Sequence, residues 1–255
     1  MLNALSIRDK LTKLGIPIPL IKYLSLTFRF LARYRNRYQA IKYRKLRVTT
    51  PLDIVTNHFK YWSSLDHPNR KAFEIVISEI NGSAANIVET GTSAWGTDST
   101  RLWDKYVTHY GGSFQSVDIR SEPAMRLKGQ IGKRSRLVVS DSIDFLNNNL
   151  PDEHIDVFFL DSWDVDWFNP LDSAIHGFKE FQAIVHRLKN GSILFVDDTP
   201  ISQEWLPDEF RESAQKFKNE YGIFPGKGAF IIRELMSNPN VQFLNHEYSV
   251  VIRFP

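Results

Sequence analysis

The sequence predicts an α/β fold, a doubly wound, mostly parallel sheet of about seven strands that closes with a C-terminal antiparallel hairpin. Two patterns in the chain support this prediction. From residue 86 onward, short segments rich in Val, Ile and Phe alternate with helix-like segments, and two strand-like segments end the chain. A length of 255 residues is sufficient for one such domain with a sizeable core. An N-terminal helical extension is predicted to precede the sheet.

Residues 1–80 are expected to form this extension, and residues 81–255 the main domain. Residues 1–47 contain 12 Lys and Arg and one acid, Asp9, with aromatic residues interleaved. The pattern suits a helix, broken at GIPIP, that packs on the main domain or on a second subunit, or that lies on an anionic membrane surface. We favour packing, while a homodimer and peripheral membrane contact stay open. No nucleic-acid partner is expected, because the sequence has no motif for one.

Two helices, in PLDIVTNHFKYWSSL and PNRKAFEIVISEING, complete the extension, because a proline opens each and Gly82 closes the second. Strands are then predicted in NIVET, SFQSVDI, RLVVS, IDVFFLD and SILFVDD, with helices at about 97–110, 121–130, 142–149 and 172–189. The unbroken apolar character of the strands indicates a parallel sheet with helices on both faces. VQFLNHEYSVVIRF predicts the hairpin, with its turn around Asn245–His246.

The composition excludes several kinds of site. The chain has no cysteine, which excludes disulfides, zinc–thiolate sites and cysteine nucleophiles. No apolar run approaches the roughly 18 residues of a membrane span, and no cleavable leader pattern is present. We therefore expect a cytoplasmic protein, with any membrane contact confined to the membrane surface.

Each predicted parallel strand ends in acidic or hydroxyl residues. These residues are Glu89, Asp118, Ser140, Asp141, Ser142, Asp161, Asp197 and Asp198. In a doubly wound sheet the carboxyl ends of the strands meet at one edge, and ligands bind there, at the switch point in strand order. Solvation alone explains an occasional polar strand end but not one at every strand, so the pattern predicts a ligand cleft.

The turn after the first strand, NIVETGTSAWGTDST, carries an acid and two glycines. It lacks the spacing of the dinucleotide fingerprint, because Ser93 and Trp95 stand where glycines would be needed. Glu89 at the strand end suits a ligand with a cationic or amino-acid group, whose carboxylate would meet backbone N–H groups at the next helix N-terminus. A plain strand–turn–helix connection, capped within residues 97–99, is the alternative.

The stretch VETGTSAWG resembles the first motif of the class I S-adenosylmethionine-dependent methyltransferases, and the resemblance extends over about residues 86–199. It implies a Rossmann-like fold with S-adenosyl-L-methionine as cofactor, in which Asp118 binds the ribose hydroxyls and Ser142 contacts the adenine. The cofactor-binding residues that it implies are Glu89, Gly91, Thr92, Ser93, Gly96, Asp118, Ile119, Asp141, Ser142 and Trp163.

The segments FFLDSWDVDW and ILFVDDTP resemble a narrower group, the metal-dependent O-methyltransferases of the catechol and macrolide-sugar types. This resemblance implies that Asp161, Asp197 and Asp198 bind Mg²⁺, an ion that prefers carboxylate and water oxygens. In the alternative, Asp197 or Asp198 only caps the loop before Pro200.

The same resemblance leaves the general base open. Trp163 matches a tryptophan in an Asp-x-Trp-Lys pattern, but Asp164 stands where that pattern has its basic lysine. The catalytic candidates are therefore Asp161, Asp164 and His176, with Asp166 as a further carboxylate. In the alternative, Asp164 and Asp166 are solvated loop acids and His176 is a surface or capping residue.

The insert DVDWFNPLDSAIHGF is predicted to be a substrate lid, in which Trp167 and Phe168 stack on a sugar ring or anchor the loop. Lys227, in FPGKGAF, is predicted to lie on a loop before a helix, with contact to an anionic part of the substrate as the alternative.

The sequence thus predicts a magnesium-assisted O-methyltransferase that acts on a hydroxyl of a sugar, a glycoconjugate or another small natural product. Two alternatives remain open. One is a metal-dependent hydroxylase on the same scaffold, and the other is a catalytically inactive module that binds the cofactor or a partner.

Overall fold

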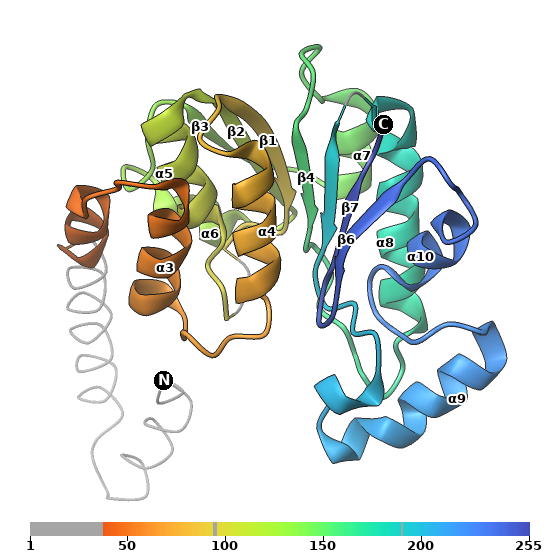
Figure 1. Cartoon of the computed structure of the whole chain (residues 1–255). Helices are drawn as coiled ribbons and strands as arrows, with labels where there is room; N and C mark the ends of the chain where they lie inside the picture. The colour runs from red at the N-terminus through yellow and green to blue at the C-terminus, as the bar shows by residue number, and fades with distance from the viewer. Residues whose placement is uncertain (1–37, 94–95, 190) are drawn as a thin grey trace, which may run out of the picture. The chain divides into compact units, whose positions relative to one another are not determined.

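The computed structural model describes residues 38–93, 96–189 and 191–255. In these residues the main chain forms a seven-stranded sheet with the order β3-β2-β1-β4-β5-β7-β6 (Figure 1). The strands are β1 (Ala85–Thr90), β2 (Gly112–Asp118), β3 (Ser135–Val139), β4 (Val157–Leu160), β5 (Ile193–Val196), β6 (Gln242–His246) and β7 (Val250–Arg253). Strands β1 to β5 pair in parallel, whereas β7 is antiparallel to both β5 and β6. This confirms the predicted doubly wound sheet with its C-terminal hairpin.

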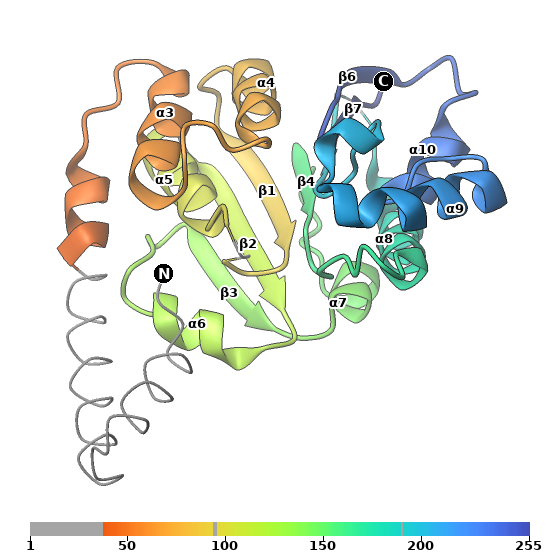
Figure 2. The ribbon, with the colours of Figure 1, turned by 90° about the horizontal axis from the view of Figure 1, so that it is seen from below.

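Helices cover both faces of the sheet (Figure 2). They are α3 (Pro51–Trp62), α4 (Arg70–Ile80), α5 (Thr100–Tyr110), α6 (Ser121–Leu127), α7 (Ser142–Asn148), α8 (Leu171–Ile184), α9 (Arg211–Tyr221) and α10 (Ala229–Leu235), with short 3₁₀ turns η1 (Val185–Arg187), η2 (Gln203–Trp205) and η3 (Asp208–Phe210). Successive strand residues point to opposite faces. Phe159 of β4 therefore packs with Phe73 of α4 and Trp103 of α5, whereas Phe158 joins Phe181 of α8 in a second core. Apolar packing on both faces explains why the strands lack polar alternation.

The boundary of the N-terminal extension lies earlier in the chain than the sequence analysis placed it. The chain divides into compact units between Leu46 and Arg47. Helices α3 and α4 belong to the unit of the sheet, because Phe59 and Phe73 are fully buried in its core. Their amphipathic patterns resembled those of an independent extension, but their apolar faces cover the sheet.

Residues 38–45 are helical, while the rest of the predicted extension, residues 1–37, lies outside the described residues. Its predicted packing, homodimer and membrane contacts therefore stay predictions. None of the helices in the described part of the chain is both long and apolar enough to cross a bilayer.

The hairpin turn lies two residues later than predicted. Asn245 and His246 belong to β6, and the chain reverses over residues 247–249. The Asn245 side chain explains this shift, because its Nδ2 donates a hydrogen bond of 2.9 Å to the carbonyl of Ser249 and so closes the turn from within the strand.

The order of the strands places a switch point between β1 and β4. Strand β1 pairs with β2 on one side and with β4 on the other, and a crevice forms beyond the carboxyl ends of such a pair. Gly91, directly after β1, allows the two strand ends to approach each other. Its φ is +87°, and a Cβ at this position would lie 2.1 Å from the carbonyl oxygen of Asp161. Only glycine fits both constraints.

Replacement of Gly91 by alanine is therefore expected to lower the free energy of unfolding by about 2–5 kcal/mol, through backbone strain and overpacking together. Gly191→Ala is the matched control, because Gly191 has a φ of +85° with no atom within 4 Å of a built Cβ. This control should lower the free energy of unfolding only by the backbone strain, about 1–2 kcal/mol. Urea denaturation followed by circular dichroism measures both, and equal losses would contradict the close approach of the β1 and β4 ends.

Candidate functional site

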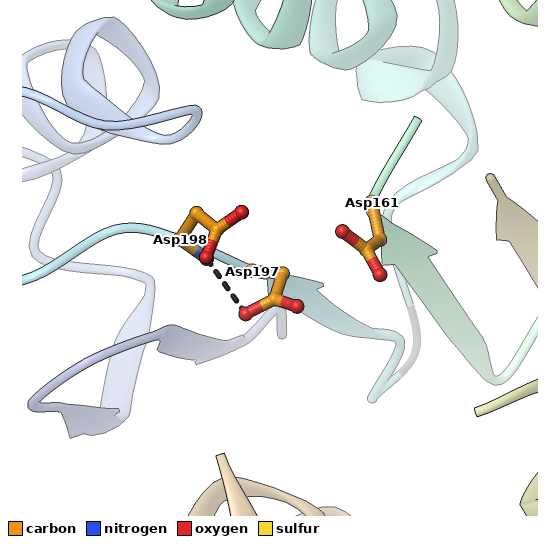
Figure 3. Close-up of side chains that lie close together, drawn as sticks. All are labelled: Asp161, Asp197 and Asp198. Carbon is orange, nitrogen blue, oxygen red and sulfur yellow. Dashed lines mark hydrogen bonds between the residues drawn. The ribbon is translucent and has the colours of Figure 1, made fainter. Parts of the chain in front are cut away.

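Three aspartates meet at the carboxyl ends of β4 and β5. Asp161 follows β4, and Asp197 and Asp198 follow β5 (Figure 3). One carboxylate oxygen from each residue lies within 4.8 Å of the others. Asp161 and Asp197 are each 5% exposed. The parallel pairing of β4 with β5 brings these strand ends together, as expected from the sequence.

A lysine lies among the same carboxylates. The Lys227 Nζ is 2.5 Å from Asp161 Oδ1 and 3.0 Å from Asp198 Oδ2, and the side chain is 3% exposed. Lys227 precedes α10, so the predicted loop before a helix is correct. Its side chain, however, is buried among the carboxylates. The only signal of this in the sequence is the pair of glycines on either side of Lys227, which indicates a close approach of the backbone. We refer to Asp161, Asp197, Asp198 and Lys227 as the charge cluster.

Neighbouring donors satisfy most of the carboxylate oxygens in the charge cluster. Asp197 Oδ1 accepts hydrogen bonds from the Asn69 Nδ2 at 2.5 Å and from the Asp198 backbone N–H at 2.7 Å. Asp198 Oδ1 accepts one of 2.7 Å from the Tyr248 hydroxyl. Asp161 Oδ2 differs, because it is buried and has no hydrogen-bond partner among the described residues. It is an acceptor oxygen directed into the site and left unused.

Burial and mutual repulsion change the acidity of these groups. Burial raises the pKa of Asp161 well above its ordinary value despite the nearby Lys227. Burial and the charge of Asp198 raise the pKa of Asp197 to about 6. For Asp198, the effect of burial is outweighed by Lys227 and the Tyr248 hydroxyl, so its pKa is lowered. Asp161 is therefore a stronger base than an ordinary carboxylate.

Glu89, predicted to contact the cofactor, is fully buried within the turn. Its carboxylate accepts hydrogen bonds from the hydroxyls of Ser99 at 2.6 Å, Thr100 at 2.5 Å and Ser116 at 2.6 Å. The register of β1 with β2 places Ser116 beside it. Burial raises the pKa of Glu89 to about 7. These contacts show that Glu89 orders the turn from beneath, and its direct contact with a cofactor stays a prediction.

Asp118, at the end of β2, is held by two groups. Its Oδ2 accepts from the Thr92 backbone N–H at 3.0 Å, which ties the first turn to the second strand. The Arg120 guanidinium pairs with both carboxylate oxygens, at 3.0 and 2.8 Å. The Arg120 side chain is more than half exposed, and the predicted contact of Asp118 with a ribose stays a prediction. Ile119, also predicted at this site, is exposed.

Two residues in the rest of the first turn have a positive φ. Ser93 has a φ of +53° and Gly96 one of +94°. The Ser93 backbone N–H donates to the Thr100 hydroxyl at 2.7 Å, and its own hydroxyl donates to Asp98. The Gly96 carbonyl accepts from the Ser63 hydroxyl at 2.8 Å, so the end of α3 helps to hold the turn.

His176 lies with the residues predicted around the adenine. Its Nε2 is 2.9 Å from the Ser162 hydroxyl and 3.2 Å from that of Ser142, and its ring centroid is 4.9 Å from that of Trp163. Ser162 also donates to Glu180 at 2.8 Å. The recorded polar partners of His176 thus include no member of the charge cluster. Its predicted role as a base therefore has no geometric support among the described residues, and it stays a prediction.

Asp141 and Asp164 occupy less specific positions. Asp141 caps α7, because its Oδ1 accepts from the Asp144 backbone N–H at 3.0 Å. Asp164 is exposed on the insert that follows β4. Its predicted role as base has no geometric support among the described residues, and it stays a prediction.

The insert after β4 is anchored to the segment around α9. The rings of Phe168 and Phe210 meet edge to face, with centroids 4.9 Å apart, and the carbonyl of Trp167 accepts from the Ser213 hydroxyl at 2.6 Å. An open groove of about 700 Å³ lies beside Phe168, and its other lining residues come from residues 209–219. The charge cluster does not line this groove. The predicted stacking of Phe168 on a sugar therefore stays a prediction.

Comparisons with known proteins identify the fold. No protein-family profile matches the chain, and no curated protein matches its sequence. One similar structure is the MycE methyltransferase from the mycinamycin biosynthetic pathway, in complex with Mg and S-adenosylhomocysteine (SAH), at 14% identity and a TM-score of 0.56. That match covers 82% of this chain and 55% of the MycE chain, so this chain spans about half of MycE.

Two further structures match over nearly their whole length. The SAH-bound Podospora anserina methyltransferase PaMTH1 is 12% identical with a TM-score of 0.52, over 87% of this chain and 96% of that one. A putative caffeoyl-CoA O-methyltransferase from Staphylococcus aureus is 11% identical with a TM-score of 0.51, over 86% and 98%. The chain therefore has the class I methyltransferase fold, which confirms the fold that the sequence resemblance implied.

The buried Glu89 should make stability depend on pH. Its folded-state pKa of about 7 exceeds the ordinary value of 4.5, so its contribution to stability is complete below the ordinary pKa and is lost as pH rises through the folded-state value. The free energy of unfolding of wild type minus that of Glu89→Gln should fall by roughly 3 kcal/mol between about pH 4 and pH 8. Urea denaturation across this range measures the difference.

The exposed Glu153 offers a matched control, because Glu153→Gln removes a carboxylate that is not buried. The free energy of unfolding of wild type minus that of Glu153→Gln should not change over the same pH range. A flat or rising difference for Glu89→Gln would contradict the burial of a carboxylate within the turn.

Proposed function

We propose that the chain transfers the methyl group of S-adenosylmethionine to a hydroxyl oxygen of a small acceptor, such as a sugar, a glycoconjugate or another natural product. The observation that carries this proposal is Asp161 Oδ2, a buried acceptor that has no partner among the described residues and lies at the switch point of a methyltransferase fold. Two structures of this fold, MycE and PaMTH1, are described with bound SAH, and MycE also with mycinamycin VI.

The cofactor would lie across the carboxyl ends of β1 and β2. Asp118 would accept hydrogen bonds from the ribose hydroxyls after Arg120 turns outward, and Trp163 with His176 would flank the adenine beside Ser142. Support for this arrangement comes from the exposed Arg120, from the contact between the tilted rings of Trp163 and His176, and from the order of the motifs along the chain. The backbone N–H groups of the first turn would receive the cofactor carboxylate.

In the proposed reaction the C–S bond of the sulfonium breaks as the acceptor oxygen forms a bond to the methyl carbon. The cofactor leaves as the neutral thioether, and the hydroxyl proton passes to Asp161 Oδ2, so charge and atoms balance. Positioning of the oxygen in line with the S–CH₃ bond supplies much of the rate. The raised pKa of Asp161 suits it to accept the proton.

The predicted magnesium ion requires a separate test of fit. Three carboxylates are suitable donors for it, and MycE is described with Mg. In this chain, however, the Lys227 ammonium already contacts two of the three carboxylates. A divalent ion and an ammonium this close repel each other strongly in a buried site. With Lys227 in this position the residues do not fit an added ion, and the mechanism assigns it no step.

Binding of SAH tests the cofactor site. We expect wild type to bind SAH in isothermal titration calorimetry, and Asp118→Asn to weaken the affinity by about tenfold or more, because a ribose acceptor is lost. Asp156→Asn is the control. Asp156 directly precedes β4 and therefore lies at the amino ends of the parallel strands, away from the carboxyl ends where the cofactor is proposed to bind. Absence of SAH binding to the folded wild type would refute the methyltransferase proposal.

Turnover tests the role of Asp161. Formation of SAH from S-adenosylmethionine is measured with a panel of sugars, glycosides and catechols as acceptors. With the active acceptor, Asp161→Asn should lower kcat by about 10²–10⁴ and leave SAH affinity near that of wild type. The Asp156→Asn control should retain kcat. Unchanged turnover in Asp161→Asn would show that another group accepts the proton.

A further inference from the structure

We propose that the Lys227 ammonium is the resident cation of the charge cluster, that it takes the place a divalent metal ion would hold there, and that it binds the acceptor oxygen. The role toward the acceptor rests on the proposed function. The exclusion of a divalent ion does not, because it follows from the ion cluster alone.

The first argument is the position of the ammonium. It lies 2.5 Å from Asp161 Oδ1 and 3.0 Å from Asp198 Oδ2, in a side chain that is 3% exposed. These are short, charge-assisted contacts. An ammonium has three N–H donors, and among the described residues only these two carboxylate oxygens accept from it. One N–H therefore remains for an acceptor oxygen that enters beside Asp161.

The second argument is that the backbone fixes Lys227 in this place. Its backbone N–H donates to the carbonyl of Asp198 at 3.1 Å. A Cβ on the preceding Gly226 would lie 2.4 Å from that same carbonyl oxygen, and one on Gly228 would lie 2.8 Å from the Thr199 side chain. Both glycines are required for the loop to lie against the end of β5.

A third glycine supports the loop from the other side. A Cβ on Gly177 of α8 would lie 2.2 Å from the carbonyl oxygen of Lys227. The Gly228 backbone N–H also donates to the Thr199 hydroxyl at 2.9 Å. Three glycines thus allow the backbone around Lys227 to lie against the end of β5 and against α8. A lysine that formed its ion pairs by chance at the surface would not need such close backbone contacts.

The third argument is electrostatic. Without a cation, these three carboxylates would repel one another, and the two buried ones, Asp161 and Asp197, would remain poorly solvated. A single ammonium reduces that repulsion, and its free N–H can stabilise the negative charge that develops on the acceptor oxygen. A divalent ion would supply the same two effects. Because both cations need the same oxygens, each excludes the other.

The test is a titration of the full-length protein with Mn²⁺, an ion that shares carboxylate and water ligands with Mg²⁺ and is detected by electron paramagnetic resonance. Wild type should leave the signal of free Mn²⁺ unchanged, with and without SAH. Lys227→Gln should bind one Mn²⁺ per chain, with an affinity about a hundredfold or more above that of wild type. The double variant Lys227→Gln/Asp197→Asn should lose this binding again.

Lys71→Gln is the matched control, because Lys71 pairs with Glu247 on the surface and not within the charge cluster. It should behave as wild type does. Circular dichroism establishes which variants are folded. If Lys227→Gln does not fold, Mn²⁺ binding is compared between wild type and Asp197→Asn alone. The proposal then predicts that neither protein binds the ion at the charge cluster.

Binding of one Mn²⁺ to wild type that Asp197→Asn abolishes would overturn the proposal, because the metal would then displace Lys227. A folded Lys227→Gln that binds no Mn²⁺ would also overturn it, since the lysine would then not occupy a cation site. Neither result depends on methyl transfer. Failure of the proposed function would show instead as absent SAH binding, while the Mn²⁺ results would stand.

Discussion

The gathering of three carboxylates, two of them buried and the third partly buried, around one ammonium is the constraint on which the rest of this site depends. Asp161 and Asp197 come from the ends of different strands, and such charges remain buried only when a cation and hydrogen-bond donors compensate them. Lys227, Asn69 and Tyr248 supply that compensation. Asn69 precedes α4 and Tyr248 lies in the hairpin turn, so the charge cluster joins segments that are far apart in the sequence.

The same constraint explains several features of the main chain. The carboxyl ends of β1 and β4 approach each other at the switch point because Gly91 carries no Cβ, and the loop that presents Lys227 lies against β5 because Gly226 and Gly228 carry none. Nearby, Glu89 is buried beneath the first turn by three hydroxyls. The crevice edge is thus built from close backbone contacts and internally satisfied polar groups, which is how an active site can be ordered before its ligands bind.

The sheet could be predicted from the sequence because each strand is a short apolar segment that ends in an acidic or hydroxyl residue. This pattern is local, and it repeats along the chain. Parallel pairing predicted that Asp161, Asp197 and Asp198 lie at one edge of the sheet, and the resemblance to the metal-dependent O-methyltransferases implied that the three meet. Lys227 was not predictable, because its partners lie about 30 and 66 residues away and no local pattern records which side of a loop faces the sheet. For the same reason the sequence did not show that the polar partners of His176 are Ser142, Ser162 and Glu180. The sequence placed the boundary after α4, whereas the compact unit that holds the sheet begins at Arg47, because the burial of Phe59 and Phe73 against the sheet is a tertiary contact that local pattern does not record.

The central claim is that this methyltransferase fold carries its cation within the chain. It is tested most directly by a crystal structure of the full-length protein grown with SAH and excess MnCl₂, with diffraction data collected at the manganese absorption edge. The account predicts no anomalous peak among the three aspartates, with density for the Lys227 Nζ between Asp161 and Asp198. An anomalous peak bound by Asp161, Asp197 and Asp198, with Lys227 turned away, would contradict it.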